Sequence, residues 1–177
     1  MMSKKQEKYS VGIRIFHWLT SACVFTLLIV GWYMTSLEES VPNKYSFFNF
    51  HESLGIVVLV VTASRVFLKF KSNQLELPSH LGPYEKKLAN SVHFLLYGLL
   101  FLMPLTGILM TLLGGYKVPF FIFEFPNIFP TNKNASKFFE NTHGIFAYTI
   151  AALIGFHILG ILKELILKKK NLLKRMI

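Results

Sequence analysis

Long apolar segments alternate with short polar ones along this chain, and four of the apolar segments have the length that a bilayer requires. A membrane-spanning helix needs about 20 largely apolar residues. The pattern therefore predicts helices at about residues 11–34, 49–70, 88–113 and 138–167. The first segment is too long for the apolar part of a signal peptide and lacks a small-residue cleavage pattern, so we expect it to stay in the protein. The prediction is an all-α, integral-membrane four-helix bundle, with residues 1–177 as a single domain.

The segment between the third and fourth predicted helices, residues 114–137, is rich in Phe and contains Pro119, Pro126 and Pro130. Proline is poorly tolerated inside helices, and aromatic side chains are enriched where a membrane meets water. We therefore expect this segment to be a loop that lies at the membrane interface and does not span the bilayer.

The net charge of +10 does not indicate a nucleic-acid partner, because the basic residues flank the apolar segments. With four spans, both termini lie on one side of the membrane, and 15 of the 19 Lys and Arg residues fall on that side. The other side has only Lys44, Lys117, Lys133 and Lys137. Since cytoplasmic segments of membrane proteins carry the excess of Lys and Arg, we expect both termini in the cytoplasm.

The chain has one cysteine, Cys23. It therefore has no internal disulfide, and it has no C-x-x-C-H motif for covalent attachment of haem. An iron–sulfur cluster held by several cysteines is excluded for the same reason. Redox metal chemistry in this protein would have to depend on other ligands, and the histidines are the candidates.

Two histidines lie on the predicted fourth helix, His143 and His157, 14 residues apart. An α-helix has 3.6 residues per turn and rises about 1.5 Å per residue, so this step is close to four turns and about 21 Å. Both rings therefore leave the same face of the helix at two depths. Ionisable residues inside a membrane usually face the bundle interior and serve a function. The spacing indicates two separate sites, one above the other.

The predicted topology gives each of these histidines a partner at its own depth. The first helix starts at the cytoplasm, so His17 lies with His157 near the inner face. The second helix starts outside, so His51 lies with His143 near the outer face. Two imidazoles at one depth are the axial ligands of a low-spin haem b, so we predict two haems b whose iron is held by these two pairs.

Other interpretations of the histidines remain. A zinc or copper site would need its ligands at one depth, with carboxylate or thiolate help. The separation along the fourth helix, about 21 Å, prevents one metal from joining the two pairs. The remaining alternative is that the histidines form polar contacts between helices or a proton path.

The same 14-residue step singles out three further positions. Gly31 and Gly107 fall at the level of the outer haem, where a missing side chain leaves room for a flat macrocycle. Close packing of helices is the alternative for both glycines. Arg65 falls at the level of the inner haem, where its guanidinium can pair with haem propionates. An anchor at the inner membrane face is the alternative for Arg65.

Two more residues are candidates for a quinone site near the inner haem. His93 lies at the inner end of the third predicted helix and would contact quinone or donate a proton to it; an interfacial histidine with its polar tip in water is the alternative. Glu164 follows His157 by two turns and would relay protons, unless it is simply a solvated helix end. His80 lies in a polar loop, and we expect it to be solvated.

The histidines belong to a set of short motifs whose order and spacing are specific when taken together. These are His17-Trp18, His51-Glu52-Ser53-Leu54-Gly55 with Arg65, His93 with Tyr97, Pro104 and Gly107, then His143, His157 and Asn171-Leu172-Leu173-Lys174-Arg175-Met176. Over nearly its whole length the chain resembles the bacterial cytochrome b561 family. The resemblance implies a four-helix bundle of the bacterial inner membrane that binds two haems b, with ligand positions at His17, His51, His143 and His157.

Within that family the chain looks most like the superoxide oxidases, in which electrons pass from superoxide to membrane ubiquinone. The resemblance thus implies an oxidoreductase that takes electrons from a one-electron donor on the outer side, such as superoxide, and delivers them to quinone in the membrane. The alternative is a non-catalytic haem-bearing anchor of a hydrogenase- or dehydrogenase-type complex, which would have a large soluble partner protein. A haem-free transporter or structural protein is the third hypothesis.

Overall fold

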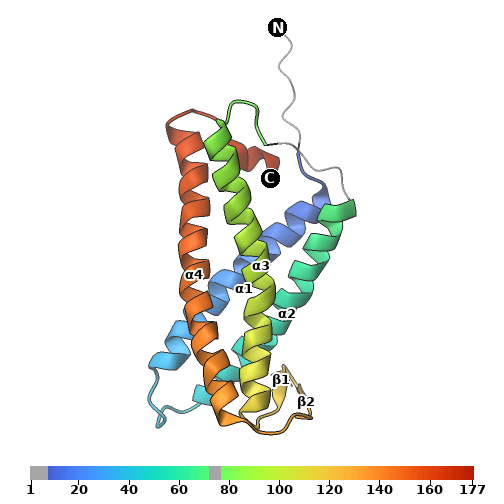
Figure 1. Ribbon diagram of the computed structural model, residues 1–177, viewed down its shortest axis with the longest axis vertical. Coiled ribbons are helices and arrows are strands. Elements are labelled where there is room, and N and C mark those ends of the chain that lie inside the picture. The colour runs from blue at the N-terminus through green and yellow to red at the C-terminus, as the bar shows by residue number, and fades with distance from the viewer. Residues whose placement is uncertain (1–7, 72–76) are drawn as a thin grey trace.

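Four long helices make up most of the computed structural model, which describes residues 8–71 and 77–177 (Figure 1). In chain order they are α1 (Val11–Ser36), α2 (Lys44–Lys71), α3 (Pro83–Leu113) and α4 (Lys133–Ile166). Each of them is long and apolar enough to cross a membrane. The predicted set of four membrane-spanning helices is confirmed in this respect, and the side of the membrane that each end faces stays a prediction.

Three helices begin several residues earlier than the hydropathy pattern predicts, at Lys44 (α2), Pro83 (α3) and Lys133 (α4). Hydropathy marks only the apolar part of a helix, whereas polar caps extend it. At the start of α3, Pro83 suits the first helical position, and the Gly82 N–H donates to the Glu85 carboxylate at 2.9 Å. At the start of α4, the Ala135 N–H donates to the Asn132 side chain at 3.0 Å, which is a helix N-cap.

The helices pack as two neighbouring pairs, α1 with α2 and α3 with α4, and α2 joins the pairs by its contacts with α3 (Figure 1). At one end, which we call the terminus end, the 3-10 helix η1 (Leu172–Arg175) folds back against the start of α1. There the Tyr9 N–H donates to the Arg175 carbonyl at 3.1 Å, and the Trp18 indole N–H donates to the Met176 carbonyl at 2.9 Å. The two ends of the described chain therefore meet.

Large apolar side chains cover the outside of the bundle. Ile29, Phe94 and Phe156, on three different helices, are 65%, 77% and 61% exposed. Exposing this much apolar surface to water along four helices would be strongly unfavourable, whereas hydrocarbon solvates it. The outer surface of the four helices is therefore in contact with the lipid bilayer.

The opposite end of the bundle, which we call the hairpin end, contains a small element that the sequence did not predict. Strand β1 (Val118–Phe120) pairs antiparallel with β2 (Phe123–Phe125), with Val118 opposite Phe125. Residues 114–137, expected to be a loop, thus contain a hairpin, and their last five residues belong to α4. Strands of three residues are too short to show an alternating pattern. The location of this segment at the membrane interface stays a prediction.

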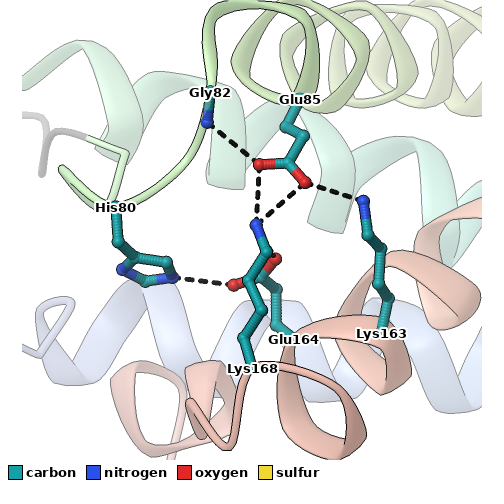
Figure 2. A network of polar contacts seen from close by, with 6 residues as sticks. All are labelled: His80, Gly82, Glu85, Lys163, Glu164 and Lys168. Carbon is teal, nitrogen blue, oxygen red and sulfur yellow. Dashed lines mark hydrogen bonds and ion pairs between the residues drawn. The ribbon is translucent and has the colours of Figure 1, made fainter.

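A network of ion pairs closes the terminus end (Figure 2). The Glu85 carboxylate, at the start of α3, binds Lys163 at 2.7 Å and Lys168 at 2.8 Å. Lys168 also binds Glu164 at 3.0 Å, and Glu164 lies 2.7 Å from His80 Nε2. The hydrogen bond to Glu85, and then that to Glu164, raises the pKa of Lys168, so its ammonium stays charged at neutral pH. His80 is exposed, as expected of a residue in a polar loop, but its ring also binds the Glu164 carboxylate, which the sequence did not predict.

Glu85→Ala is expected to lower the Tm of the protein by about 2–4 °C. The variant removes the carboxylate that Lys163 and Lys168 bind and the acceptor for the Gly82 N–H. Glu140→Ala is the matched control, because Glu140 forms a single pair with Lys137 and the two side chains are 56% and 64% exposed. The control should change Tm by less than about 1 °C. Equal melting curves for the two variants, measured in one detergent, would contradict a stabilising network.

Candidate functional site

One pair of histidines lies near the hairpin end. His51 of α2 and His143 of α4 have ring centroids 6.2 Å apart, with the ring planes at 69°. Both rings line an open cavity of about 1460 Å³. Its remaining wall is mostly apolar and includes Gly31, Val58 and Ile150 from three helices. The cavity is larger than the pockets of several hundred Å³ that hold most small ligands, so its volume is sufficient for a large cofactor.

A second pair lies near the terminus end. His17 of α1 and His157 of α4 have ring centroids 6.4 Å apart, with the ring planes at 70°. The geometry is nearly that of the first pair. On α4, the 14 residues between His143 and His157 lie within one continuous helix, so the two pairs are separated by about 21 Å of helix rise.

The separation of the rings fits one metal ion between the two imidazoles of each pair. A nitrogen of imidazole binds a first-row metal at about 2 Å and lies about 1.1 Å from the centre of its own ring, so rings on opposite sides of one metal have centroids about 6.2 Å apart. The distances in both pairs, 6.2 and 6.4 Å, agree with a metal between the rings, and they also lie within the range of direct edge contact between rings. Ligation of haem iron by these two pairs stays a prediction.

The distance between ring centroids also distinguishes His93 from the two histidine pairs. Its ring lies 5.1 Å from that of His157, at 74°, which is too close for two ligands on opposite sides of one metal. His93 is thus beside the terminus-end pair and in edge contact with it. The structure brings His93 to this level of the bundle, as predicted for a contact with quinone, and its binding to quinone stays a prediction.

The ring of His143 is oriented by α3. Its Nδ1 lies 3.1 Å from the Met103 carbonyl and 3.0 Å from the Thr106 hydroxyl. The Thr106 hydroxyl donates its proton to the Met103 carbonyl at 2.7 Å. Because a carbonyl only accepts, His143 carries its proton on Nδ1, and Nε2 remains for a metal. Sequence reasoning missed Thr106, because its partner lies 37 residues away.

Gly31 and Gly107 leave room for the hairpin-end histidines. A Cβ at Gly31 would lie 3.1 Å from Cε1 of His51, and a Cβ at Gly107 would lie 3.2 Å from Cε1 of His143. Both distances are shorter than ordinary van der Waals contact. The nearest neighbour of each missing side chain is therefore an imidazole ring. The predicted packing of a macrocycle against these glycines stays a prediction.

Two half-buried arginines at the terminus end, Arg14 and Arg65, provide positive charge. Arg65 stacks on Tyr97, with 5.0 Å from the guanidinium carbon to the ring centroid, and it acts electrostatically on His17 and His157. The Nε atoms of Arg65 and Arg14 are buried and have no hydrogen-bond partner within residues 8–71 and 77–177. A buried guanidinium is stable when it is paired with an anion, and haem propionates fit this need. Sequence reasoning missed Arg14, although it lies one turn before His17.

A purely apolar layer lies between the two histidine levels. Its buried members, Val24, Val58 and Ile150, each lie seven residues beyond the first histidine of their own helix. Seven residues are about 10 Å, which is half of the step between the levels. Leu100 of α3 packs against the same layer. This layer separates the two sites, and its side chains offer no hydrogen bonds to water.

Glu164, predicted near a quinone site, lies in the network of the terminus end. One carboxylate oxygen faces His80 and the other faces Lys168, and the side chain is 5% exposed. The contacts that the structure gives for Glu164 therefore run to the α2–α3 connection and to the chain after α4. Its part in proton transfer stays a prediction.

Comparison with known proteins matches this chain to a family of cytochromes. The profile of the family described as prokaryotic cytochrome b561 matches residues 8–177. The "Cytochrome b561 homolog 2" of Escherichia coli (strain K12) is 27% identical over 173 residues, which cover 97% of this chain and 92% of that protein. The "Probable superoxide oxidase CybB" of Yersinia pestis is 27% identical over 177 residues, which cover 99% of this chain and 97% of that protein.

The matches extend over both histidine pairs and all four helices, so they concern the whole bundle. The family implies binding of b-type haem, electron transfer and a multi-pass location in a bacterial membrane. These properties agree with four lipid-facing helices around two histidine pairs. This chain is a member of the prokaryotic cytochrome b561 family.

Proposed function

We propose that the protein binds two haems b and passes electrons through the membrane, from a one-electron donor at the hairpin end to membrane quinone at the terminus end. The observation that supports this most directly is the pair of ring separations, 6.2 Å for His51 with His143 and 6.4 Å for His17 with His157. Two sites at different depths suit electron transfer across a bilayer, whereas polar contacts between helices need no such spacing.

The protein supplies the ligands and the surroundings of the haems. Each haem would contribute reversible one-electron chemistry at its iron, tuned by the bis-histidine ligation. Met103 and Thr106 hold His143 in the tautomer that a metal needs. Arg14 and Arg65, whose buried Nε atoms have no hydrogen-bond partner in the described part of the chain, would pair with propionates at the terminus end. The apolar layer with Val58 at its centre keeps water out of the space between the sites.

Reduction of quinone needs protons as well as electrons, and the terminus end offers groups for both tasks. His93, in contact with His157, is the proposed contact to a quinone carbonyl and a proton donor to it. Glu164 and His80, 2.7 Å apart, form the proposed route by which protons are replaced from the aqueous side. The basic residues at this end support its location in the cytoplasm, and the inner membrane of a bacterium is the location that we propose for the bundle.

Superoxide is the donor that we propose for the hairpin end, because a relative of similar length is named a probable superoxide oxidase. Each of two superoxide anions would give up one electron and become O₂, and the quinone would take both electrons and two protons to become quinol. Three lysines at this end form ion pairs in which Nζ lies 2.7–3.0 Å from a carboxylate oxygen, so their charges are neutralised. The pairs are Lys44–Glu39, Lys117–Glu124 and Lys137–Glu140. Superoxide would therefore reach the site without strong electrostatic steering.

Rapid mixing of superoxide with quinone-loaded protein is expected to reduce quinone at a rate that changes less than about twofold between about 20 and 200 mM salt. Strong steering by a positive surface would instead slow the reaction about tenfold over such a range. The His157→Ala variant is the control, because electron delivery to quinone should stop. No reduction above the level in buffer would contradict superoxide as donor. Reduction of the haems without reduction of quinone would favour the anchor of a larger complex.

A further inference from the structure

The most deeply buried side chain in the described part of the bundle belongs to a serine that no chemistry above requires. Ser53 of α2 is 0% exposed, and it lies two residues after His51. Its hydroxyl donates to the Asn49 carbonyl, one turn back, at 2.6 Å. Its oxygen also accepts the backbone N–H of Phe121 at 2.7 Å. Ser53 thus joins α2 to a segment 68 residues away.

Phe121 is the first residue of the tight turn between β1 and β2, and its φ of 53° is in the left-handed region. Glycine is favoured at such a position, because a Cβ makes the left-handed conformation unfavourable. A phenylalanine persists there when surrounding contacts impose the conformation. The bond from the Phe121 N–H to buried Ser53 is such a contact.

The hairpin forms one wall of the cavity that contains the hairpin-end histidines. Val118 of β1 is 4% exposed and packs with α2. Lys117, Pro119 and Glu124 line the cavity together with His51. The turn itself is outside this wall, and Ile122 at its tip is 88% exposed. If the turn loosened, the wall would move and the cavity would open further to water on this side.

We propose that Ser53 is a positioning residue, which fixes the strained turn of the hairpin on α2. It thereby holds in place the hairpin wall of the open cavity around His51 and His143 and limits the access of water from that side. It acts through its bond with the Phe121 N–H and through its hydroxyl, which lies 3.4 Å from the Pro119 carbonyl, and its proposed role involves no contact with metal or substrate. Only the ferricyanide measurement described below, which needs a haem in this cavity, rests on the proposed function. The fixing of the hairpin follows from contacts within the protein and can be measured separately.

Ser53→Ala should increase the hydrogen exchange of the backbone amides of β1 and β2 about tenfold in the haem-loaded protein. Ser64→Ala is the matched control, because the Ser64 hydroxyl makes the same type of bond on the same helix, to the Val60 carbonyl, in an exposed position. Oxidation of the hairpin-end haem by ferricyanide should also accelerate about tenfold in Ser53→Ala, because the oxidant is water-soluble, while the second haem is unchanged.

A second-site variant tests the mechanism. Phe121→Gly removes the strain of the left-handed turn, so Ser53→Ala with Phe121→Gly should return both rates to within about twofold of wild type. A packing defect at Ser53 alone would not be rescued in this way. If Ser53→Ala fails to fold, Ser53→Cys, whose thiol is a weaker acceptor, should show a smaller increase of the same kind.

Equal exchange in Ser53→Ala and Ser64→Ala, or no rescue by Phe121→Gly, would overturn the proposal. Failure of the proposed function gives a different result. A wild-type protein without haem at the hairpin end would have no signal in the ferricyanide measurement, whereas the amide exchange would still respond to Ser53.

Discussion

His143→Ala is expected to lower the haem content from about two to about one per chain. The remaining haem should keep the visible spectrum of a low-spin b-type cytochrome, because its proposed ligands, His17 and His157, are about 21 Å of helix rise away from the substitution. Removing one axial imidazole leaves His51 as the sole protein ligand proposed for the hairpin-end site. The measurement is a reduced-minus-oxidised spectrum, with haem quantified against protein.

Two further variants make this result specific. His157→Ala should also leave about one haem per chain, but the remaining haem should now be the one at the hairpin end, with a different midpoint potential. His80→Ala should keep both haems, because its ring binds Glu164 in the terminus-end network. Full haem content in His143→Ala would contradict the ligand assignment. A wild-type protein without any haem spectrum would leave the histidines as polar contacts or a proton path.

The second large effect is expected from Gly107→Leu, which should remove the hairpin-end haem or convert it to a high-spin form. A Cβ at Gly107 already lies 3.2 Å from Cε1 of His143, and a full leucine side chain needs the space that this ring occupies. The ring must then leave its position between α3 and α4. We expect the haem content to fall toward about one per chain, as in His143→Ala.

Gly98→Leu is the control on the same helix, because a Cβ at Gly98 meets nothing within 4 Å. This variant should keep both haems and their spectra. Gly31→Leu should repeat the loss through the other ring, since a Cβ at Gly31 lies 3.1 Å from Cε1 of His51. If Gly107→Leu and Gly98→Leu had the same haem content, the glycines would serve helix packing and not the histidines.

The sequence predicted the depth of each histidine in the candidate site better than it predicted the contacts around each ring. A helix in a bilayer has a fixed rise per residue and a fixed thickness to cross, so position along the chain becomes depth. His51 and His143, which were predicted at one depth, are neighbours in the structure. His93 was predicted at the inner level, and it lies against His157. Their binding to haem and quinone stays a prediction until the variants above are measured.

Contacts between distant segments escaped prediction, because they depend on how the helices pack and turn about their axes. The partners of His143 on α3, Met103 and Thr106, lie about forty residues away. The bond between His80 and Glu164 joins positions 84 residues apart. No periodicity along one helix contains such information, because it records only the helix's own face and depth.

The sequence by itself determined four helices long and apolar enough to span a membrane and two levels of histidines, because helix rise and bilayer thickness act on each segment separately. The tertiary structure alone decided the ring separations of 6.2 and 6.4 Å, the edge contact of His93, and the hairpin that Ser53 holds. These features depend on the rotation and approach of neighbouring helices. The rotation and the distance of neighbouring helices are determined by packing contacts between side chains that are far apart in the chain.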